Sequence, residues 1–246
     1  MPVRLAVIGG SGLDLSDFLV GIAAKRIPTP YGDPSADPVV GRVGGVDVAF
    51  LARHGRGHAV PPHRINHRAN LWALKELGVR RILATSSVGS LKRDIPPGSL
   101  AVPDDFLCLW ALPTFHDDKV VHVTPALDDG MRKAIIAVSR RKGARVRGKA
   151  VYAQTLGPRL ETKAEIRLLR DYADVVGMTM ASEATLAAEI GIAYACLCTV
   201  DNYAHGITVK SLTYTDIVSA QRKNAKSVAR LMPSLLDDLA AKGDNV

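Results

Sequence analysis

The chain has 246 residues, of which 47% are hydrophobic and 5% are aromatic, and its formal net charge is +8. This length and apolar content suffice for a packed core, so the composition excludes a disordered protein. The scarcity of aromatic residues argues against a platform on which single-stranded nucleic acid stacks. The charge alone is compatible with a basic nucleic-acid-binding protein and with an enzyme that acts on small anions.

The cysteines and the N-terminus bear on the compartment. The three cysteines, Cys108, Cys196 and Cys198, lack the even number and spacing of a disulfide framework, and the C-x-C pair lacks partners for a zinc site. The apolar run at the N-terminus is short and ends in Gly9 and Gly10, unlike a secretory signal or a membrane span. We therefore expect a cytoplasmic protein with no metal site and no membrane contact.

Short apolar runs recur along the chain and predict strands that are buried on both faces, because apolar residues follow one another without alternation. These strands are expected at residues 5–8, 46–52, 81–84, 100–102, 150–154, 175–178 and 193–199. Apolar residues at three- and four-residue spacing predict helices over residues 66–77, 127–142, 162–172, 182–190 and 215–241. The alternation predicts an α/β fold in one domain over residues 1–246, with a mixed central sheet flanked by helices on both faces.

Ligands of such folds bind where loops leave the carboxyl ends of strands, and three of these loops suit an anion. The Gly-Gly-Ser-Gly turn at residues 9–12 offers backbone amides and the Ser11 hydroxyl. The second loop brings Arg53, whose planar guanidinium fits phosphate oxygens, together with His54. The third contains Ser86 and Ser87. Taken singly, each loop is also compatible with a tight turn, a basic surface loop or turn capping.

Several further segments accompany these loops in a fixed order, at residues 8–13, 29–32, 52–56, 66–70, 89–91, 157–162 and 176–179. Together they resemble the trimeric purine nucleoside phosphorylase and methylthioadenosine phosphorylase family, over a match from Gly9 to about Val218. The resemblance implies a three-layer phosphorylase/hydrolase-like fold and an assembly of three or six subunits. It also implies a phosphate site made by Ser11, Arg53, His54, Ser86, Ser87 and Thr179.

The resemblance extends to the nucleoside. Met178 would pack on the ribose with Glu183 near it, and Leu160 takes the place of an aromatic residue that stacks on the base. Read alone, Met178 is equally an ordinary core residue and Glu183 a carboxylate on a helix surface.

The base itself would meet residues that differ from those of relatives acting on 6-amino purines. Those relatives carry two aspartates where this chain has Asn202 and Ala204. The Asn202 amide can donate to a purine N7 or 6-oxo oxygen, and the Glu161 carboxylate can accept from the N1–H of a 6-oxopurine. A one-residue shift in this correspondence would instead bring the Asp201 carboxylate to the base.

At the 5′ end, family members that act on ordinary nucleosides supply a histidine to the 5′-hydroxyl, whereas the methylthio branch uses small apolar residues. Residues 214–218 contain no histidine, so the resemblance implies a methylthio substituent, with Thr215 and Val218 beside it. Thr215 could still bond a 5′-hydroxyl. His58 and His122 resemble histidines that the family supplies near this end from a neighbouring subunit.

The expected reaction is the phosphorolysis of S-methyl-5′-thioinosine or another 6-oxopurine nucleoside, with no cofactor. Phosphate is the second substrate, His54 helps to hold it, and Asn202 and Glu161 stabilise the departing base. A methylthioadenosine phosphorylase is the alternative, and a basic nucleic-acid-binding protein is a distant one.

Overall fold

The computed structural model describes residues 3–10, 13, 19–209 and 213–241, and within them the predicted alternation of strands and helices is confirmed. The strands are β1 (Leu5–Gly9), β2 (Val20–Ala24), β3 (Val39–Val43), β4 (Val46–Ala52), β5 (Arg81–Ser90), β6 (Leu100–Ala101), β7 (Asp105–Cys108), β8 (Val146–Arg147), β9 (Val151–Gln154), β10 (Val175–Gly177) and β11 (Ala193–Tyr203). The helices are α1 (His67–Glu76), α2 (Asp129–Arg141), α3 (Lys163–Tyr172), α4 (Met180–Glu189) and α5 (Tyr214–Ala241).

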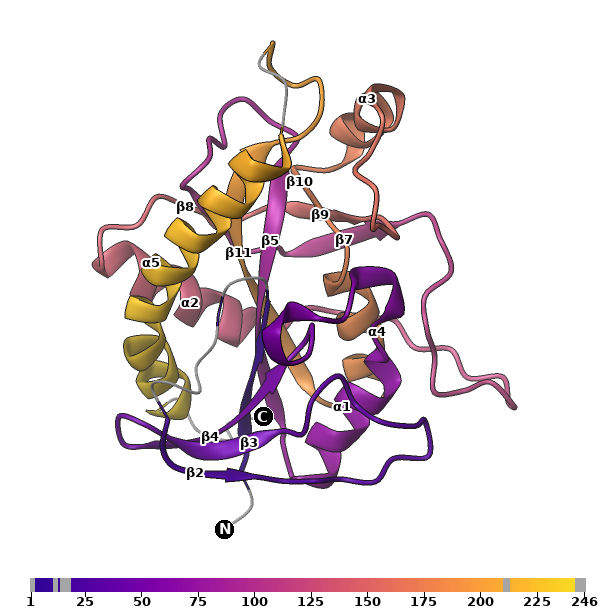
Figure 1. Ribbon diagram of the computed structural model, residues 1–246, viewed down its shortest axis with the longest axis vertical. Helices are drawn as coiled ribbons and strands as arrows, with labels where there is room; N and C mark the ends of the chain where they lie inside the picture. Colours follow the sequence, from indigo (N-terminus) through magenta and orange to yellow (C-terminus); the bar gives the residue numbers. More distant parts are fainter. Residues whose placement is uncertain (1–2, 11–12, 14–18, 210–212, 242–246) are drawn as a thin grey trace.

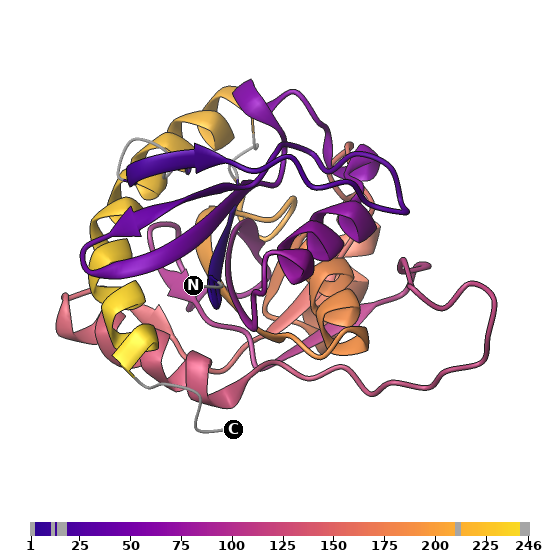
Figure 2. The same ribbon diagram turned by 90° about the horizontal axis from the view of Figure 1, so that it is seen from below.

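The described strands form one mixed sheet, as the sequence predicts. Its path runs β2-β3-β4-β1-β5-β10-β9-β7, and β11 lies parallel to β5 along the whole of that long strand. Helices α1 and α4 lie on one side of the sheet, and α2 and α5 on the other (Figures 1 and 2). None of the helices in the described ranges is both long enough and apolar enough to cross a bilayer.

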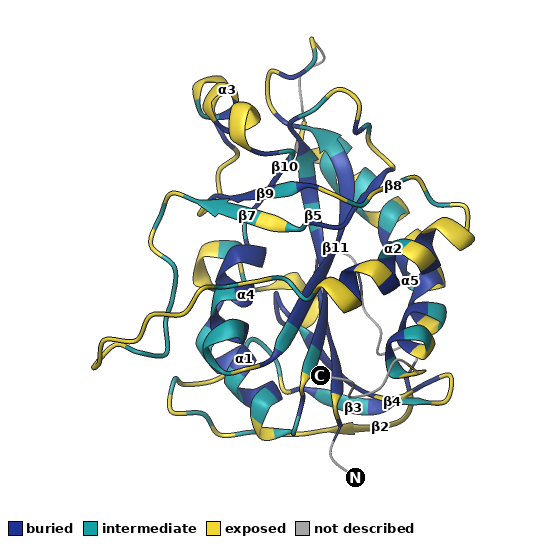
Figure 3. Ribbon diagram, turned by 180° about the vertical axis from the view of Figure 1, so that it is seen from behind, coloured by how far each residue is buried: buried dark blue, intermediate teal, exposed yellow. Residues whose placement is uncertain are grey.

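Strand β1 explains why the predicted strands have no polar face. Leu5 and Val7 pack into the hydrophobic cluster that includes α2 and α5, whereas Ala6 and Ile8 pack into the cluster on the α1 and α4 side. Each face of the sheet is therefore covered by helices, and only an uninterrupted apolar run satisfies both. Burial is concentrated in these central strands (Figure 3).

A split in the sheet positions the cavity described below. Strand β1 pairs with β5 only as far as Ile8 opposite Ala84, and β10 joins the same edge of β5 at Gly89 and Ser90. Between these two partners, a short stretch of that edge of β5 has neither strand beside it. The stretch contains the residues that the sequence suggests as an anion loop.

Several element boundaries differ from the predicted ones. Residues 85–90, expected as a loop, continue β5, because β11 pairs with them through to Tyr203. Helix α4 begins at Met180, two residues before the predicted start. Strands β2, β3, β7 and β8 were not predicted. The loop at residues 109–128 projects from the body of the molecule (Figures 1 and 2).

Candidate active site

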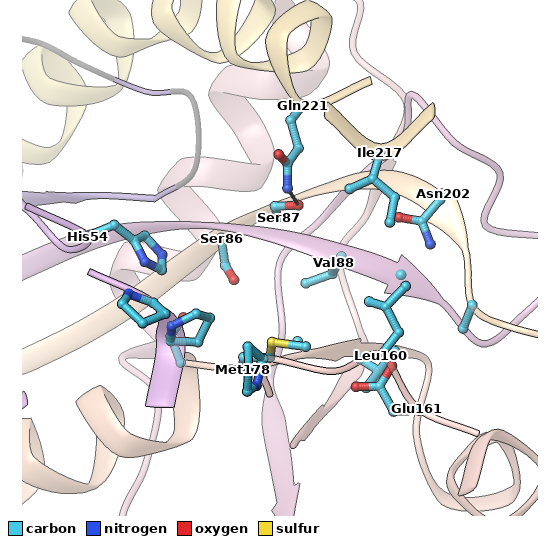
Figure 4. A pocket seen from close by; sticks show the side chains of 18 of the residues that line it. His54, Ser86, Ser87, Val88, Leu160, Glu161, Met178, Asn202, Ile217 and Gln221 are labelled. Atoms are coloured by element: carbon cyan, nitrogen blue, oxygen red, sulfur yellow. Dashed lines mark hydrogen bonds between the residues drawn. The ribbon is translucent and has the colours of Figure 1, made fainter. Parts of the chain in front are cut away.

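A cavity of about 570 Å³ opens at the split in the sheet, a volume within the range of small-molecule sites. Figure 4 shows His54 and Ser86 at one side of it, Asn202, Leu160 and Glu161 at the other, and Met178 between. Its lining comes from β5, β10, β11 and α5 and from the segments that follow β4, β9, β10 and β11. It comprises Arg53, His54, His58, Ala59, Pro61, Pro62, Ser86, Ser87, Val88, Gly89, Pro158, Leu160, Glu161, Val176, Gly177, Met178, Thr179, Asn202, Ala204, His205, Ile217 and Gln221.

Arg53 lies immediately after β4 and is buried, with 1% of its surface exposed. Its Nε and Nη2 donate to the two carboxylate oxygens of Glu183, at 2.5 and 2.9 Å, and its Nη1 donates to the Thr85 carbonyl oxygen at 2.6 Å. Burial alone would raise the pKa of Glu183, but the Arg53 charge and hydrogen bonds hold that pKa below its ordinary value. Glu183 is therefore ionised and fixes the orientation of the guanidinium.

Close backbone approach also keeps Arg53 in place. A Cβ atom on Gly10 would lie 2.8 Å from Arg53 Nη1 and 2.4 Å from the Thr85 carbonyl oxygen, so this position requires glycine. Gly10, which belongs to the glycine turn suggested by the sequence, thus packs directly on the arginine. Two of the five guanidinium N–H groups remain after the bonds to Glu183 and Thr85, enough for a bidentate contact with an anion.

His54 and His58 lie side by side next to Arg53, with ring centroids 4.3 Å apart. Burial, followed by the Arg53 charge, lowers the pKa of His54 to about 4, so the ring is neutral at pH 7. His54 Nδ1 lies 2.9 Å from the Val60 carbonyl oxygen and must donate to it, which leaves Nε2 as an acceptor in the neutral ring. His54 Nε2 can therefore accept a hydrogen bond from a protonated phosphate oxygen.

Thr179 and Ser86 complete this end of the cavity. Thr179 precedes the first turn of α4, and its side chain makes no capping bond there, so the hydroxyl is available to a ligand. A helix N-terminus favours an anion through its unpaired N–H groups and its dipole. The Thr179 N–H donates to the buried Tyr152 hydroxyl, and the Ser86 hydroxyl lies 3.5 Å from the same oxygen.

At the opposite end, the two residues expected to meet the base both line the cavity. Glu161 is buried and accepts a hydrogen bond from the Thr155 hydroxyl at 2.6 Å, on one carboxylate oxygen only. The Asn202 amide donates to the Tyr203 carbonyl oxygen at 2.9 Å, which leaves a second N–H. Gly89 allows the close approach, because a Cβ there would lie 3.3 Å from the Asn202 amide nitrogen.

A β-bulge determines which residue of β11 faces the base pocket. Val200 pairs with Val88 and Asn202 pairs with Gly89, so Asp201 is the extra residue between them. Asp201 accepts hydrogen bonds from Ser87 and Asn224, whereas Asn202 lines the cavity. The structure therefore favours Asn202 over the one-residue shift that would bring Asp201 to the base.

The middle of the cavity is apolar. Met178 lies against Gly157, where a Cβ would come within 2.4 Å of the methionine sulfur, so the approach of the two segments depends on glycine. Leu160 is 46% exposed on the cavity rim, and Ile217 of α5 faces it across the opening (Figure 4). Ala204 also lines this region.

Five expected site residues do not lie where the sequence places them or fall outside the described part of the chain. Ser11 lies outside the described residues. Thr215 is exposed and Val218 is half-buried on α5, and neither lines the cavity, where Ile217 of the same helix does. His122 is exposed on the projecting loop. His58, expected from a neighbouring subunit, lines the cavity of its own chain.

Glu183 and Gln221 also differ from the sequence-based expectations. The interpretation of Glu183 as a helix-surface carboxylate is wrong, because this side chain is fully buried against Arg53. Gln221, which the sequence did not suggest, lines the cavity one helical turn after Ile217, and the four-residue spacing of the pair on a predicted helix is a signal for it. The described residues hold no cluster of three His, Cys, Asp or Glu side chains arranged for a metal ion.

Comparison with known proteins identifies the family of the chain. The chain is 44% identical over 229 residues to a probable 6-oxopurine nucleoside phosphorylase of Archaeoglobus fulgidus, covering 93% of each chain, and 40% identical to an S-methyl-5′-thioadenosine phosphorylase of Hyperthermus butylicus, covering 98% of this chain and 90% of the relative. The crystal structure of a methylthioadenosine phosphorylase from an Antarctic soil metagenomic library superposes with a TM-score of 0.89 at 34% identity, covering 100% of this chain and 89% of the other. The family model described as the phosphorylase superfamily matches residues 4–237, and the chain belongs to this superfamily of enzymes.

Proposed function

We propose that the protein cleaves the glycosidic bond of a purine nucleoside by phosphorolysis. The observation that carries this proposal is a single cavity with a buried arginine and a free threonine hydroxyl at one end and an amide and a carboxylate at the other. The first pair suits inorganic phosphate, and the second suits the edge of a purine. The names of the relatives in the same superfamily support the same reaction class.

Phosphate would act as nucleophile and as counter-charge to an oxocarbenium-like ribose. Arg53, Thr179 and Ser86 would orient it, and its position beside Met178 would place it at the anomeric carbon of a ribose that packs on the methionine. Holding both reactants in one geometry removes much of the entropic barrier. Fixed donors aimed at the charge that develops supply electrostatic stabilisation. Ser11, which is not described, remains part of the proposal from its place in the glycine turn.

The base pocket favours a 6-oxopurine. Thr155 occupies one oxygen of Glu161, and the other can accept from the N1–H that a 6-oxopurine carries and adenine lacks. Asn202 can donate to the 6-oxo oxygen or to N7. A site built on such a pattern can lower kcat/KM for the mismatched base by a factor of up to ~10^4, because the buried polar groups of the site stay unpaired.

For the 5′ substituent, S-methyl-5′-thioinosine is the favoured substrate. Ile217 and Met178 give the cavity an apolar wall, and the exposed Thr215 does not reach it. His58 and Gln221, however, offer polar atoms in the same cavity, which keeps inosine and guanosine as candidate substrates. Methylthioadenosine is the alternative, supported by the relative of that name.

We further propose a homo-oligomer of three or six subunits, located in the cytoplasm, that works without metal or organic cofactor. The projecting loop exposes Val120, Val121 and Val123, which favours association with another copy. The three cysteines are free, as expected in a reducing compartment. Light scattering after size-exclusion chromatography measures the mass, and fluorescence microscopy of a tagged chain tests the location.

The test of the reaction is turnover of methylthioinosine, methylthioadenosine, inosine and guanosine, each with and without phosphate. The proposal predicts cleavage only with phosphate, a sugar 1-phosphate product, and the highest kcat/KM for a 6-oxopurine. Cleavage that needs no phosphate would make the protein a hydrolase. Salt-dependent nucleic-acid binding without any cleavage would support the basic nucleic-acid-binding alternative.

A further inference from the structure

Four polar side chains form a hydrogen-bonded chain beside the cavity, joining β5, β11 and α5. Gln221 Nε2 donates to the Ser87 hydroxyl oxygen at 3.0 Å (Figure 4), and the Ser87 hydroxyl donates to the Asp201 carboxylate. Asn224 Nδ2 donates to the other Asp201 oxygen at 2.7 Å. Asn224 lies three residues after Gln221, so the two side chains at the ends of this hydrogen-bonded series come from one face of α5.

This arrangement fixes the direction of the Ser87 proton. A hydroxyl has one proton to donate and two lone pairs. An ionised carboxylate only accepts, so the Ser87 proton points to Asp201, and one lone pair is taken by Gln221. Ser87 lines the cavity, but in this state it presents a lone pair, and not a proton, to an anion there.

A neutral Asp201 would reverse this direction. The carboxyl group of Asp201 would then donate its proton to one lone pair of the Ser87 oxygen. Gln221 would still donate to the other lone pair. The Ser87 proton is then free to be donated into the cavity. The hydrogen bonds from Gln221 to Ser87 and from Asn224 to Asp201 are kept in both states, so the interchange moves protons without repacking these side chains.

We propose that Asp201 is a positioning residue that controls phosphate affinity through the Ser87 hydroxyl, withholding the hydroxyl proton as a carboxylate and releasing it toward phosphate when neutral. The inference rests on the proposed function, because phosphate is the anion that receives the released bond. The proton comes from solvent and is taken up with phosphate. Neutral Asp201 also removes a negative charge near the dianion.

The surroundings of Asp201 favour such a change. Burial raises the pKa of Asp201, although hydrogen bonds from Asn224, Ser87 and Thr199 oppose this effect. The groups that face it from β5 and α5 are the neutral Ser87 and Asn224. On its own strand, the titratable neighbour is Cys198, and burial raises the pKa of this thiol well above its ordinary value, so it carries no charge.

The test is the Asp201→Asn variant, which imitates the neutral state at every pH. Its amide nitrogen can donate to Ser87, and its amide oxygen can accept from Asn224. We expect a KM for phosphate roughly tenfold lower than that of the wild type where the wild-type Asp201 is ionised, the size of one added bond to a charged ligand. The ratio of the two KM values should approach one as the pH falls. The ionisation of phosphate itself cancels in this ratio.

Two controls separate this role from a purely structural one. In a Ser87→Ala background, Asp201→Asn should change the KM for phosphate by less than about twofold, because no hydroxyl remains to reorient. Asn224→Ala loosens α5 and also removes a hydrogen bond that lowers the pKa of Asp201, so it should leave the KM unlowered at a pH where Asp201 is still ionised. Calorimetry of phosphate binding in buffers of different ionisation enthalpy should show fewer protons taken up by Asp201→Asn than by the wild type.

An unchanged or higher KM for phosphate in folded Asp201→Asn, or equal proton uptake by the two proteins, overturns the inference. An equal decrease in the Ser87→Ala background overturns it as well, because the effect would then bypass the hydroxyl. If the wild type shows no phosphate-dependent cleavage at all, the proposed function fails instead, and the two failures are thereby distinct.

Discussion

Replacing Glu183 by Gln tests whether this residue fixes the arginine of the phosphate site. Both members of the Arg53–Glu183 pair are 1% exposed at the side chain, and two hydrogen bonds of 2.5 and 2.9 Å join them. Tyr194 also donates to Glu183, at 2.8 Å. An amide would turn one acceptor into a donor that faces Arg53 or Tyr194. Leaving the arginine as an uncompensated buried charge should lower the free energy of unfolding by about 3–5 kcal/mol.

The assay is urea unfolding of the wild type and the variant at pH 7, with and without phosphate. Phosphate should stabilise Glu183→Gln more than the wild type, because it becomes the counter-ion of the unpaired Arg53. Glu165→Gln is a matched control, since Glu165 forms a similar pair with Arg159 at the surface. This substitution should lower the free energy of unfolding far less.

The contribution of Glu183 to the free energy of unfolding should decrease in acid. The folded-state pKa of Glu183 lies below its ordinary value of 4.5, so its stabilisation is complete above that value and is lost as the pH falls through the folded pKa. The gap between wild type and Glu183→Gln should therefore narrow in acid. Two results would refute the reasoning. One is a free energy of unfolding that Glu183→Gln leaves unchanged at pH 7, and the other is a difference between the two proteins that grows in acid.

Four further outcomes are expected. Asn202→Ala should lower kcat/KM by roughly 10^2 to 10^3, the loss for one donor aimed at developing charge, and unchanged turnover would contradict this. Glu161→Gln should reduce the preference for 6-oxopurines over 6-amino purines in competition assays, because an amide can also donate to adenine N1. The ring signals of His54 in NMR spectra should not titrate between about pH 5 and pH 8 without phosphate, since its pKa is lowered to about 4. Dialysis against EDTA should leave phosphate-dependent turnover intact.

The sequence indicates the fold and the anion-binding end of the site because both depend on local patterns. Continuous apolar runs mark strands covered on both faces, and Arg53 and His54 directly follow one of them. The glycine turn alone indicates that another segment approaches the backbone closely at Gly10, and in the structure this neighbour is the Arg53 side chain. Short edge strands such as β2 were missed because their residues are exposed and carry no such pattern.

The remaining features depend on contacts between distant segments. Glu183 lies on a helix with a plain sequence pattern, and its burial comes from pairing with an arginine 130 residues away. The bulge at Asp201 results from the pairing of β11 with β5. Gln221 enters the cavity because α5 packs across the end of that sheet. No local pattern encodes these contacts, although each determines what the cavity presents to a ligand.

A crystal structure with bound phosphate and a 6-oxopurine base tests the central claim most directly. The account predicts phosphate within hydrogen-bond distance of Arg53 and Thr179, and the base between Asn202 and Glu161, with Met178 beside the gap that a ribose fills. Phosphate bound elsewhere on the basic surface, with Arg53 reaching only Glu183 and Thr85, would contradict it.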